Sequence, residues 1–301
     1  MIVVEILGHL FVQLVFTVGF LLLYGGLISL CNRCFYDACG DAAYGIVRLT
    51  GYIGTPIHEY SHALMCLLFG HTVKKVSVFG NSKRSKTLGY VEHTYYRKNL
   101  YQQIGNFFIG VSPILAGGAV ILLLVRLLTP EMFFAMKRET TEIRVSLAGG
   151  FGGVIPSFFS GLGAMLGSFF ALQNFLDWRW WLCMVLSFSI AIHMEVSRSD
   201  IRSGIRGLGV ISAMLLVADS ILGFLFPKAL AAVTSACVTV GIFVAFVLLI
   251  PAVFSLIIGG ISLIVIFVRE TAQSIKNDQA KPRANQRSLP AKMSSDTKSK
   301  E

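Results

Sequence analysis

The chain has 301 residues, of which 54% are hydrophobic and only 14% are charged. In soluble domains about a quarter of the residues are charged. This composition therefore excludes an ordinary soluble protein and favours a multi-span membrane protein. The net charge of +10 is uneven: residues 71–100 hold seven Lys or Arg against one Glu, and the residues after Val268 are also basic. Such segments are typical of cytoplasmic loops, and no nucleic-acid-binding motif accompanies them.

The first predicted element is a retained transmembrane helix within residues 1–41. This segment has no basic leader, Glu5 precedes its apolar run, and the run is long enough to span a bilayer. An external loop with Cys31, Cys34 and Cys39 is expected to follow. These cysteines are interpreted as interfacial thiols, with an external disulfide or a metal site as alternatives, because no second Cys-x-x-Cys motif pairs with them.

The second apolar segment, residues 42–69, contains the motif His58-Glu59-Tyr60-Ser61-His62. Imidazole and carboxylate groups are costly in hydrocarbon, so a polar cluster in this setting predicts a functional site. Residues i and i+4 share one face of a helix, so His58 and His62 can bind one metal ion, and Glu59 can take a proton from water beside it. Two buried histidines with local hydrogen bonds are the alternative, but the complete pattern favours zinc.

The residues on either side of the motif also carry signals. Thr55-Pro56 resembles an N-cap followed by a proline at the first helical position, so either a helix break or an ordinary proline kink is expected there. Behind the motif, Lys74–Phe79 and Thr87–Tyr96 alternate in polarity around Gly80-Asn81-Ser82, which predicts a short β-hairpin in the cytoplasm. The edge of this hairpin could receive an extended peptide, and a simple solvated loop is the alternative.

The rest of the chain predicts further membrane helices. The glycine-rich stretch 145–173 is expected to be a broken or re-entrant element, and the basic loop 198–206 is placed in the cytoplasm. About six transmembrane helices result, with eight as the alternative, depending in part on whether the last segment divides near Pro251. The tail 270–301 is expected to be disordered, basic and cytoplasmic. The other expected spans are 103–128, 178–197, 207–226 and 229–268.

A catalytic zinc usually takes three protein ligands and keeps one position for water. The predicted topology brings the end of the fifth span to the side of the membrane where the motif lies. Asp200 is the preferred third ligand, with His193 and Glu195 as alternatives. Asp200 could instead cap a helix, and His193 could form an interhelical hydrogen bond. His71 and His93 are less favoured, because His71 suits a helix end and His93 lies in a polar, strand-like loop.

With these residues the chain resembles the site-2-protease family of intramembrane zinc metalloproteases, and most closely a divergent, uncharacterised bacterial branch. The resemblance covers roughly residues 42–207. It rests on the His-Glu-x-x-His motif, the hairpin-like insertion, the Gly-x-x-Pro element Gly110–Pro113, and Asp200 near a helix end. Family members carry Asn-x-x-Pro followed by Leu-Asp-Gly; His193 stands where the Asn would be, and the Pro, Leu and final Gly are absent. The resemblance implies a Zn²⁺ cofactor and cleavage of membrane-embedded peptides.

The sequence as a whole predicts an all-α membrane-embedded zinc endopeptidase of the bacterial cytoplasmic membrane, acting on a membrane protein or peptide within the lipid bilayer. Its metalloprotease core would occupy residues 42–206, followed by C-terminal transmembrane helices in 207–269. Two alternatives stay open: a non-catalytic metal-binding scaffold, and a transporter whose intramembrane histidines move protons or metal ions. The cysteines within apolar helices are interpreted as packing residues: Cys66, Cys183 and Cys237.

Overall fold

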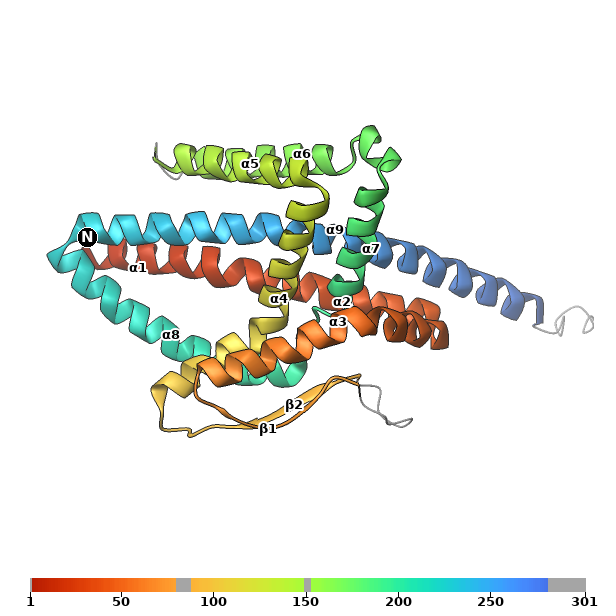
Figure 1. Cartoon of the computed structure of the whole chain (residues 1–301), viewed down its shortest axis with the longest axis horizontal. Coiled ribbons are helices and arrows are strands. Elements are labelled where there is room, and N and C mark those ends of the chain that lie inside the picture. Colours follow the sequence, from red (N-terminus) through yellow and green to blue (C-terminus); the bar gives the residue numbers. More distant parts are fainter. Residues whose placement is uncertain (1, 80–87, 149–152, 281–301) are drawn as a thin grey trace, which may run out of the picture.

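The computed structural model describes residues 2–79, 88–148 and 153–280. Helices make up most of the described chain, together with one two-stranded antiparallel sheet (Figure 1). In chain order the elements are α1 (Ile2–Leu14), a π-helical turn (Val15–Gly19), α2 (Phe20–Cys39), α3 (Asp41–Leu68), β1 (Thr72–Ser77), β2 (Tyr90–Thr94), α4 (Leu100–Leu128), α5 (Pro130–Ala148), α6 (Val154–Phe169), a 3₁₀ turn (Leu172–Leu176), α7 (Trp178–Ala191), α8 (Arg198–Leu225) and α9 (Pro227–Ala280).

Several of these helices fit a membrane. Among the described residues, five helical segments are long and apolar enough to cross one: Ile2–Cys39, Leu100–Leu128, Ile155–Leu176, Ser199–Leu225 and Pro227–Asn277. α3 is not among them, and α7, with 14 residues, is about 21 Å long, too short to cross alone. The protein is therefore an α-helical membrane protein, and the number of spans stays a prediction.

The prediction that the first transmembrane helix ends before a loop with Cys31, Cys34 and Cys39 is wrong. The helical segment that begins at Ile2 continues through α2 to Cys39, so the region expected as an external loop is helical. Cys31 lies buried in α2 against α9, where a Cβ on Gly259 would be 2.9 Å from its sulfur. All six cysteines are free, so the alternative of a disulfide is not seen. Close helix packing, rather than exposure at an interface, accounts for the position of Cys31.

The last helix also differs from expectation. α9 continues through Pro251 without a break and extends to Ala280, so the first residues of the tail expected to be disordered are helical. The neighbours Ile250 and Ala252 are both 2% exposed, and packing around the proline supports the helix at this point. Residues 281–301 lie outside the described part of the chain. In the glycine-rich stretch, α5 ends before the undescribed residues 149–152 and α6 begins after them.

Figure 1 shows how the helices are arranged. α1, α2 and α9 run along the longest axis of the molecule, and α4 and α7 run across them. α5 and α6 lie side by side at one edge, while α3 and the hairpin lie at the opposite edge. The main core forms where α4 and α7 cross α1, α2 and α9, and its most deeply buried members include Ile28, Ile114, Ile121, Cys183 and Leu248.

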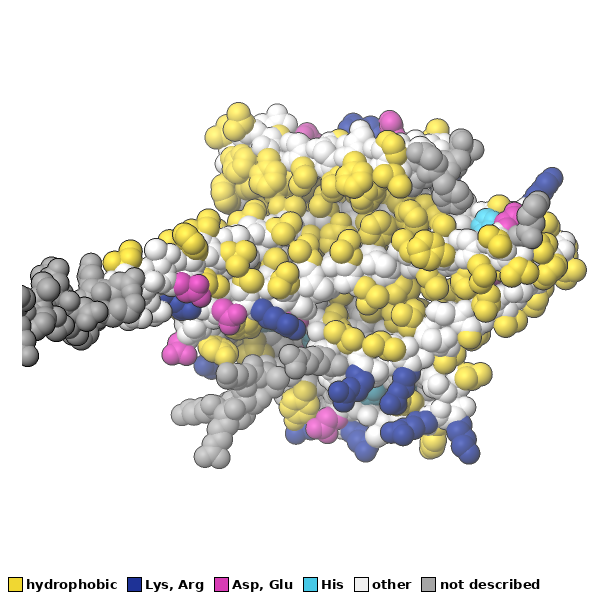
Figure 2. Space-filling model, turned by 180° about the vertical axis from the view of Figure 1, so that it is seen from behind, with side chains coloured by type: hydrophobic (Ala, Val, Ile, Leu, Met, Phe, Trp, Pro, Cys, Tyr) yellow, Lys and Arg dark blue, Asp and Glu magenta, His cyan; other side chains and the backbone are white. Residues whose placement is uncertain are grey.

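Basic side chains gather at the edge that carries the hairpin. Figure 2 shows Lys and Arg along the lower side of the molecule, where Figure 1 places β1, β2 and the beginning of α8. The two basic segments predicted to share one side of the membrane therefore lie at one edge, although residues 198–206, expected as a loop, form the beginning of α8. The exposed cations of these segments include Lys74, Lys75, Arg97, Lys98, Arg202 and Arg206.

A buried polar cluster joins α1, α8 and α9 inside the bundle. Gln13 donates its side-chain amide to Asp219 Oδ1 at 3.2 Å and to Thr234 Oγ1 at 3.0 Å. His9 Nδ1 lies 2.9 Å from the same Thr234 hydroxyl. Gln13 and Asp219 are each 1% exposed, so these hydrogen bonds tie three apolar helices together where water does not compete.

Candidate metal centre

The motif helix α3 is continuous across the proline that precedes the motif. α3 begins at Asp41 and contains Pro56 in its interior, so the predicted break at this position is not seen. The glycine one turn before the motif has a packing role. A Cβ on Gly54 would collide with the ring of His193 and with the carbonyl oxygen of Ser189. Glycine at this position therefore lets the connection between α7 and α8 lie directly against α3.

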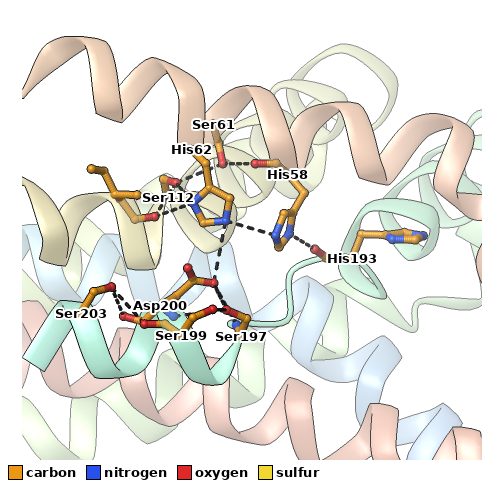
Figure 3. A network of polar contacts seen from close by, with 10 residues as sticks. His58, Ser61, His62, Ser112, His193, Ser197, Ser199, Asp200 and Ser203 are labelled. Atoms are coloured by element: carbon orange, nitrogen blue, oxygen red, sulfur yellow. Dashed lines mark hydrogen bonds and ion pairs between the residues drawn. The ribbon is translucent and has the colours of Figure 1, made fainter. Parts of the chain in front are cut away.

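His58 and His62 face each other across one turn of α3 (Figure 3). Their Nε2 atoms are 3.2 Å apart. His58 Nδ1 lies 2.6 Å from the carbonyl oxygen of His193. His62 Nδ1 lies 2.8 Å from the carbonyl oxygen of Ile109. A carbonyl oxygen can only accept a hydrogen bond, so each Nδ1 carries a proton and, in neutral rings, each Nε2 presents a lone pair to the other.

This arrangement fits zinc. Zn–N bonds and tetrahedral angles place two nitrogen ligands about 3.3 Å apart, and the two Nε2 atoms are 3.2 Å apart. Zinc-binding histidines also donate their second ring nitrogen to a carbonyl or carboxylate, which fixes the ring. The two Nε2 lone pairs repel each other, and a proton shared between them would also remove this repulsion. It would, however, leave a positive charge at His62, which is only 7% exposed, and a buried charge is costly.

Asp200 lies in the first turn of α8, with its carboxylate directed at His62 (Figure 3). Its Oδ2 is 3.9 Å from His62 Nε2. The same oxygen accepts hydrogen bonds from the backbone N–H of Ser197 at 3.1 Å and from the Ser197 hydroxyl at 2.5 Å. The N-cap expected at Asp200 is instead Ser197, and Asp200, as the N3 residue of a capping box, accepts from the backbone N–H of Ser197. As a third zinc ligand its oxygen would move closer, because neighbouring ligands lie about 3.3 Å apart.

Glycines on both helices allow α8 to reach this position. A Cβ on Gly110 of α4 would lie 2.9 Å from the carbonyl oxygen of Asp200. A Cβ on Gly207 of α8 would lie 2.6 Å from the carbonyl oxygen of Gln103. Small residues permit this close approach between helices. Gly110, the first residue of the Gly-x-x-Pro element, thus helps to place Asp200 beside the histidine pair.

The other two proposed third ligands have different partners. The ring of His193 points away from His58 (Figure 3), and its Nε2 lies 3.0 Å from Thr50 Oγ1. His193 contacts the histidine pair through its backbone carbonyl, which accepts a hydrogen bond from His58 Nδ1. Glu195 accepts a hydrogen bond at 3.4 Å from the side chain of Asn32 in α2. The geometry therefore favours Asp200 among the three.

The predicted hairpin is confirmed, and it covers Glu59. β1 and β2 pair antiparallel, with a register irregularity between Val73 and Lys75; the predicted tip lies outside the described residues. Glu59 is 6% exposed, and a Cβ on Gly89 would lie 2.6 Å from Glu59 Cγ and 2.7 Å from its Oε1. The residue just before β2 thus lies directly on the carboxylate, which is also close enough to Asp200 for the two charges to interact.

His71 and His93, which no sequence pattern connects, lie together at the end of α3. Their Nδ1 atoms are 3.1 Å apart, and His71 Nε2 lies 2.8 Å from the carbonyl oxygen of Gln102. Burial lowers the pKa of His71, although the hydrogen bond to Gln102 opposes this. Burial also lowers the pKa of His93, and the neighbouring His71 adds to the effect. Both rings therefore favour the neutral form.

A cavity of about 630 Å³ opens beside Asp200, between α2, α4 and α8. Its wall is mostly apolar and includes several glycines, while Arg33, Glu195 and Ser197 add polar groups. Its volume lies in the range of pockets that bind small ligands. The cavity thus opens onto one side chain of the candidate centre, Asp200.

Comparison of the chain with protein-family models, with curated proteins and with solved structures finds no match. The resemblance to the site-2-protease family therefore rests on the motif residues themselves, and the family stays a prediction.

Proposed function

We propose that this protein is a membrane-embedded zinc endopeptidase that cleaves membrane-associated peptides or proteins. The observation that carries the proposal is the pair of Nε2 atoms 3.2 Å apart, on rings whose Nδ1 atoms are both held by backbone carbonyls. Such a pair needs a cation between its lone pairs, and a carboxylate follows the first histidine directly in the sequence. Zinc with an adjacent general base is the arrangement of metallopeptidases.

Each residue of the centre then has a role. His58 and His62 would hold the metal, with Asp200 as the third ligand. When bound, zinc would polarise the scissile carbonyl and acidify a water molecule. The Glu59 carboxylate accepts a proton from the attacking water and delivers it to the leaving amine, so that one water yields a carboxylate and an amine.

The surroundings of the centre support a membrane substrate. Glu59 lies under the hairpin with 6% of its surface exposed, which limits the access of bulk water. The cavity beside Asp200 is mostly apolar, as a segment drawn from the bilayer requires. By the positive-inside rule the basic edge would face the cytoplasm. The proposed centre would then lie near the cytoplasmic surface of a bacterial membrane, with the basic tail on the same side.

The proposal predicts that hydrolysis depends on the metal. The full-length protein, purified in detergent, is expected to cleave model peptides with apolar helical segments, to lose this activity when a chelator removes zinc, and to regain it when zinc is returned. Peptide hydrolysis and metal content are measured on the same samples. Stoichiometric zinc without hydrolysis would favour the scaffold, and metal flux into sealed vesicles would favour the transporter.

The contact between the hairpin and Glu59 leads to a second prediction. Gly89→Ala adds a Cβ that overlaps the Glu59 carboxylate, so it is expected to slow hydrolysis by about 10- to 100-fold with zinc content unchanged, because small displacements of a catalytic group are costly. Gly45→Ala is the matched control, since a Cβ on Gly45 of α3 meets nothing within 4 Å. Wild-type rates in Gly89→Ala would mean that the hairpin does not position the base.

A further inference from the structure

α3 ends in a cap that brings His71 back beside Cys66. Gly70 has a φ of +69°, a conformation that favours glycine. Its N–H donates to the carbonyl of Leu67 at 3.2 Å, and the N–H of His71 donates to the carbonyl of Cys66 at 2.8 Å. This pair of bonds defines a Schellman motif, in which the residue after the glycine commonly makes an apolar contact with the last turn of the helix. Here those two positions hold metal-binding side chains.

The hairpin adds a third donor. His93 of β2 pairs with Val73 of β1, and its Nδ1 lies 3.1 Å from His71 Nδ1. One donor atom from each of Cys66, His71 and His93 lies within 4.8 Å of the other two. Cys66 has no exposed surface and His71 is 4% exposed, so the three groups converge in a mostly buried space.

The surrounding hydrogen bonds orient His71 as a ligand. Its Nε2 donates to the carbonyl of Gln102 at 2.8 Å, so its Nδ1 presents a lone pair to the cluster. The side chain of Gln102 donates to the carbonyl of Gly70 at 2.6 Å, and the ring of Tyr95 stacks on His71 with centroids 5.0 Å apart. A carbonyl therefore fixes the tautomer of His71, as carbonyls do for the two motif histidines.

We propose that Cys66, His71 and His93 form a second zinc site. A thiolate and two imidazoles are a donor set that zinc accepts, and the thiol of Cys66 loses its proton to solvent as the metal binds. The bound metal joins the end of α3 to β2, and so holds the strand whose preceding residue covers Glu59. This inference does not rest on the endopeptidase function, because a scaffold or a transporter could carry the same site.

Cobalt(II) distinguishes this site from the histidine pair. Metal-free, full-length protein in detergent is titrated with Co²⁺ and followed by absorption. A thiolate ligand gives a sulfur-to-cobalt charge-transfer band, which the nitrogen and oxygen donors of the first centre do not produce. In His62→Ala, where the first centre does not compete for the metal, the band is expected to saturate at about one equivalent per chain. It is expected to vanish in Cys66→Ser and in His93→Ala, and to remain in His62→Ala, which disables the first centre.

Matched variants control for other thiols and histidines. Cys183→Ser replaces another buried free cysteine, and His9→Ala replaces a histidine bonded to Thr234; both are expected to keep the band. His93 is half-buried on a strand, so His93→Ala tests the site even if Cys66→Ser fails to fold. The proposal is overturned if the folded wild type shows no band, or if the band survives Cys66→Ser or His93→Ala.

Discussion

Glu59→Gln is expected to lower the rate of peptide hydrolysis by about 10²- to 10⁴-fold while zinc stays bound, because removal of a general base costs this much. The amide matches the carboxylate in size, so the packing against Gly89 is preserved, but it cannot accept the proton of the attacking water. The measurement is the initial rate on one model peptide, with the zinc content of each sample determined in parallel.

Glu142→Gln is the control for this substitution. Glu142 is exposed on α5, so its replacement is expected to leave both the rate and the zinc content at their wild-type values. A Glu59→Gln protein that hydrolyses peptide at the full rate would exclude Glu59 as the base. Equal loss of zinc and of activity would instead assign Glu59 to the support of the metal centre.

His62→Ala is expected to weaken zinc binding at the first centre by more than about 10²-fold, since mutation of an outer-shell partner alone can cost 10- to 100-fold. Asp200→Asn is expected to weaken it as well, because the amide lacks the negative charge. His193→Ala is the informative comparison: it removes the ring but keeps the backbone carbonyl that holds His58, so zinc is expected to remain. Competition with a chelator of known affinity measures all three.

The pattern across these variants assigns the third ligand. Loss of zinc in both His62→Ala and Asp200→Asn, with retention in His193→Ala, supports Asp200. Loss in His62→Ala and His193→Ala alone would contradict that choice and move the ligand to His193. Zinc at the proposed second site would obscure these comparisons. Each variant is therefore also measured in the Cys66→Ser background, in which only the first centre can bind zinc.

The sequence predicts those parts of the protein that depend on local spacing. The i, i+4 spacing of His58 and His62 places them on one face of a helix, and the structure has that helix. Alternating polarity predicts a hairpin, which is present as β1 and β2. Apolar runs predict membrane helices, and five described segments qualify. In each case the signal lies within about one element.

Features that depend on contacts between distant elements were not predictable in the same way. The carbonyl of Ile109 orients His62. Every residue type has a backbone carbonyl, so the sequence does not reveal this contact. Gly89 contacts Glu59 only because the hairpin folds back over α3. Gly70 is a local signal for one such contact, since a glycine after a helix predicts a Schellman cap, which brings His71 beside Cys66.

With Asp200 as the proposed zinc ligand, the capping box at the start of α8 would couple the stability of this helix to the affinity for the metal. Asp200 Oδ2 accepts two hydrogen bonds from Ser197, and a lone pair used for a metal is no longer free for them. A capping interaction contributes about 1 kcal/mol, so competition of this size would weaken metal binding by about fivefold. The first turn of α8 and the bound ion would then compete for one oxygen, and loading of the centre would loosen the helix end that lines the apolar cavity.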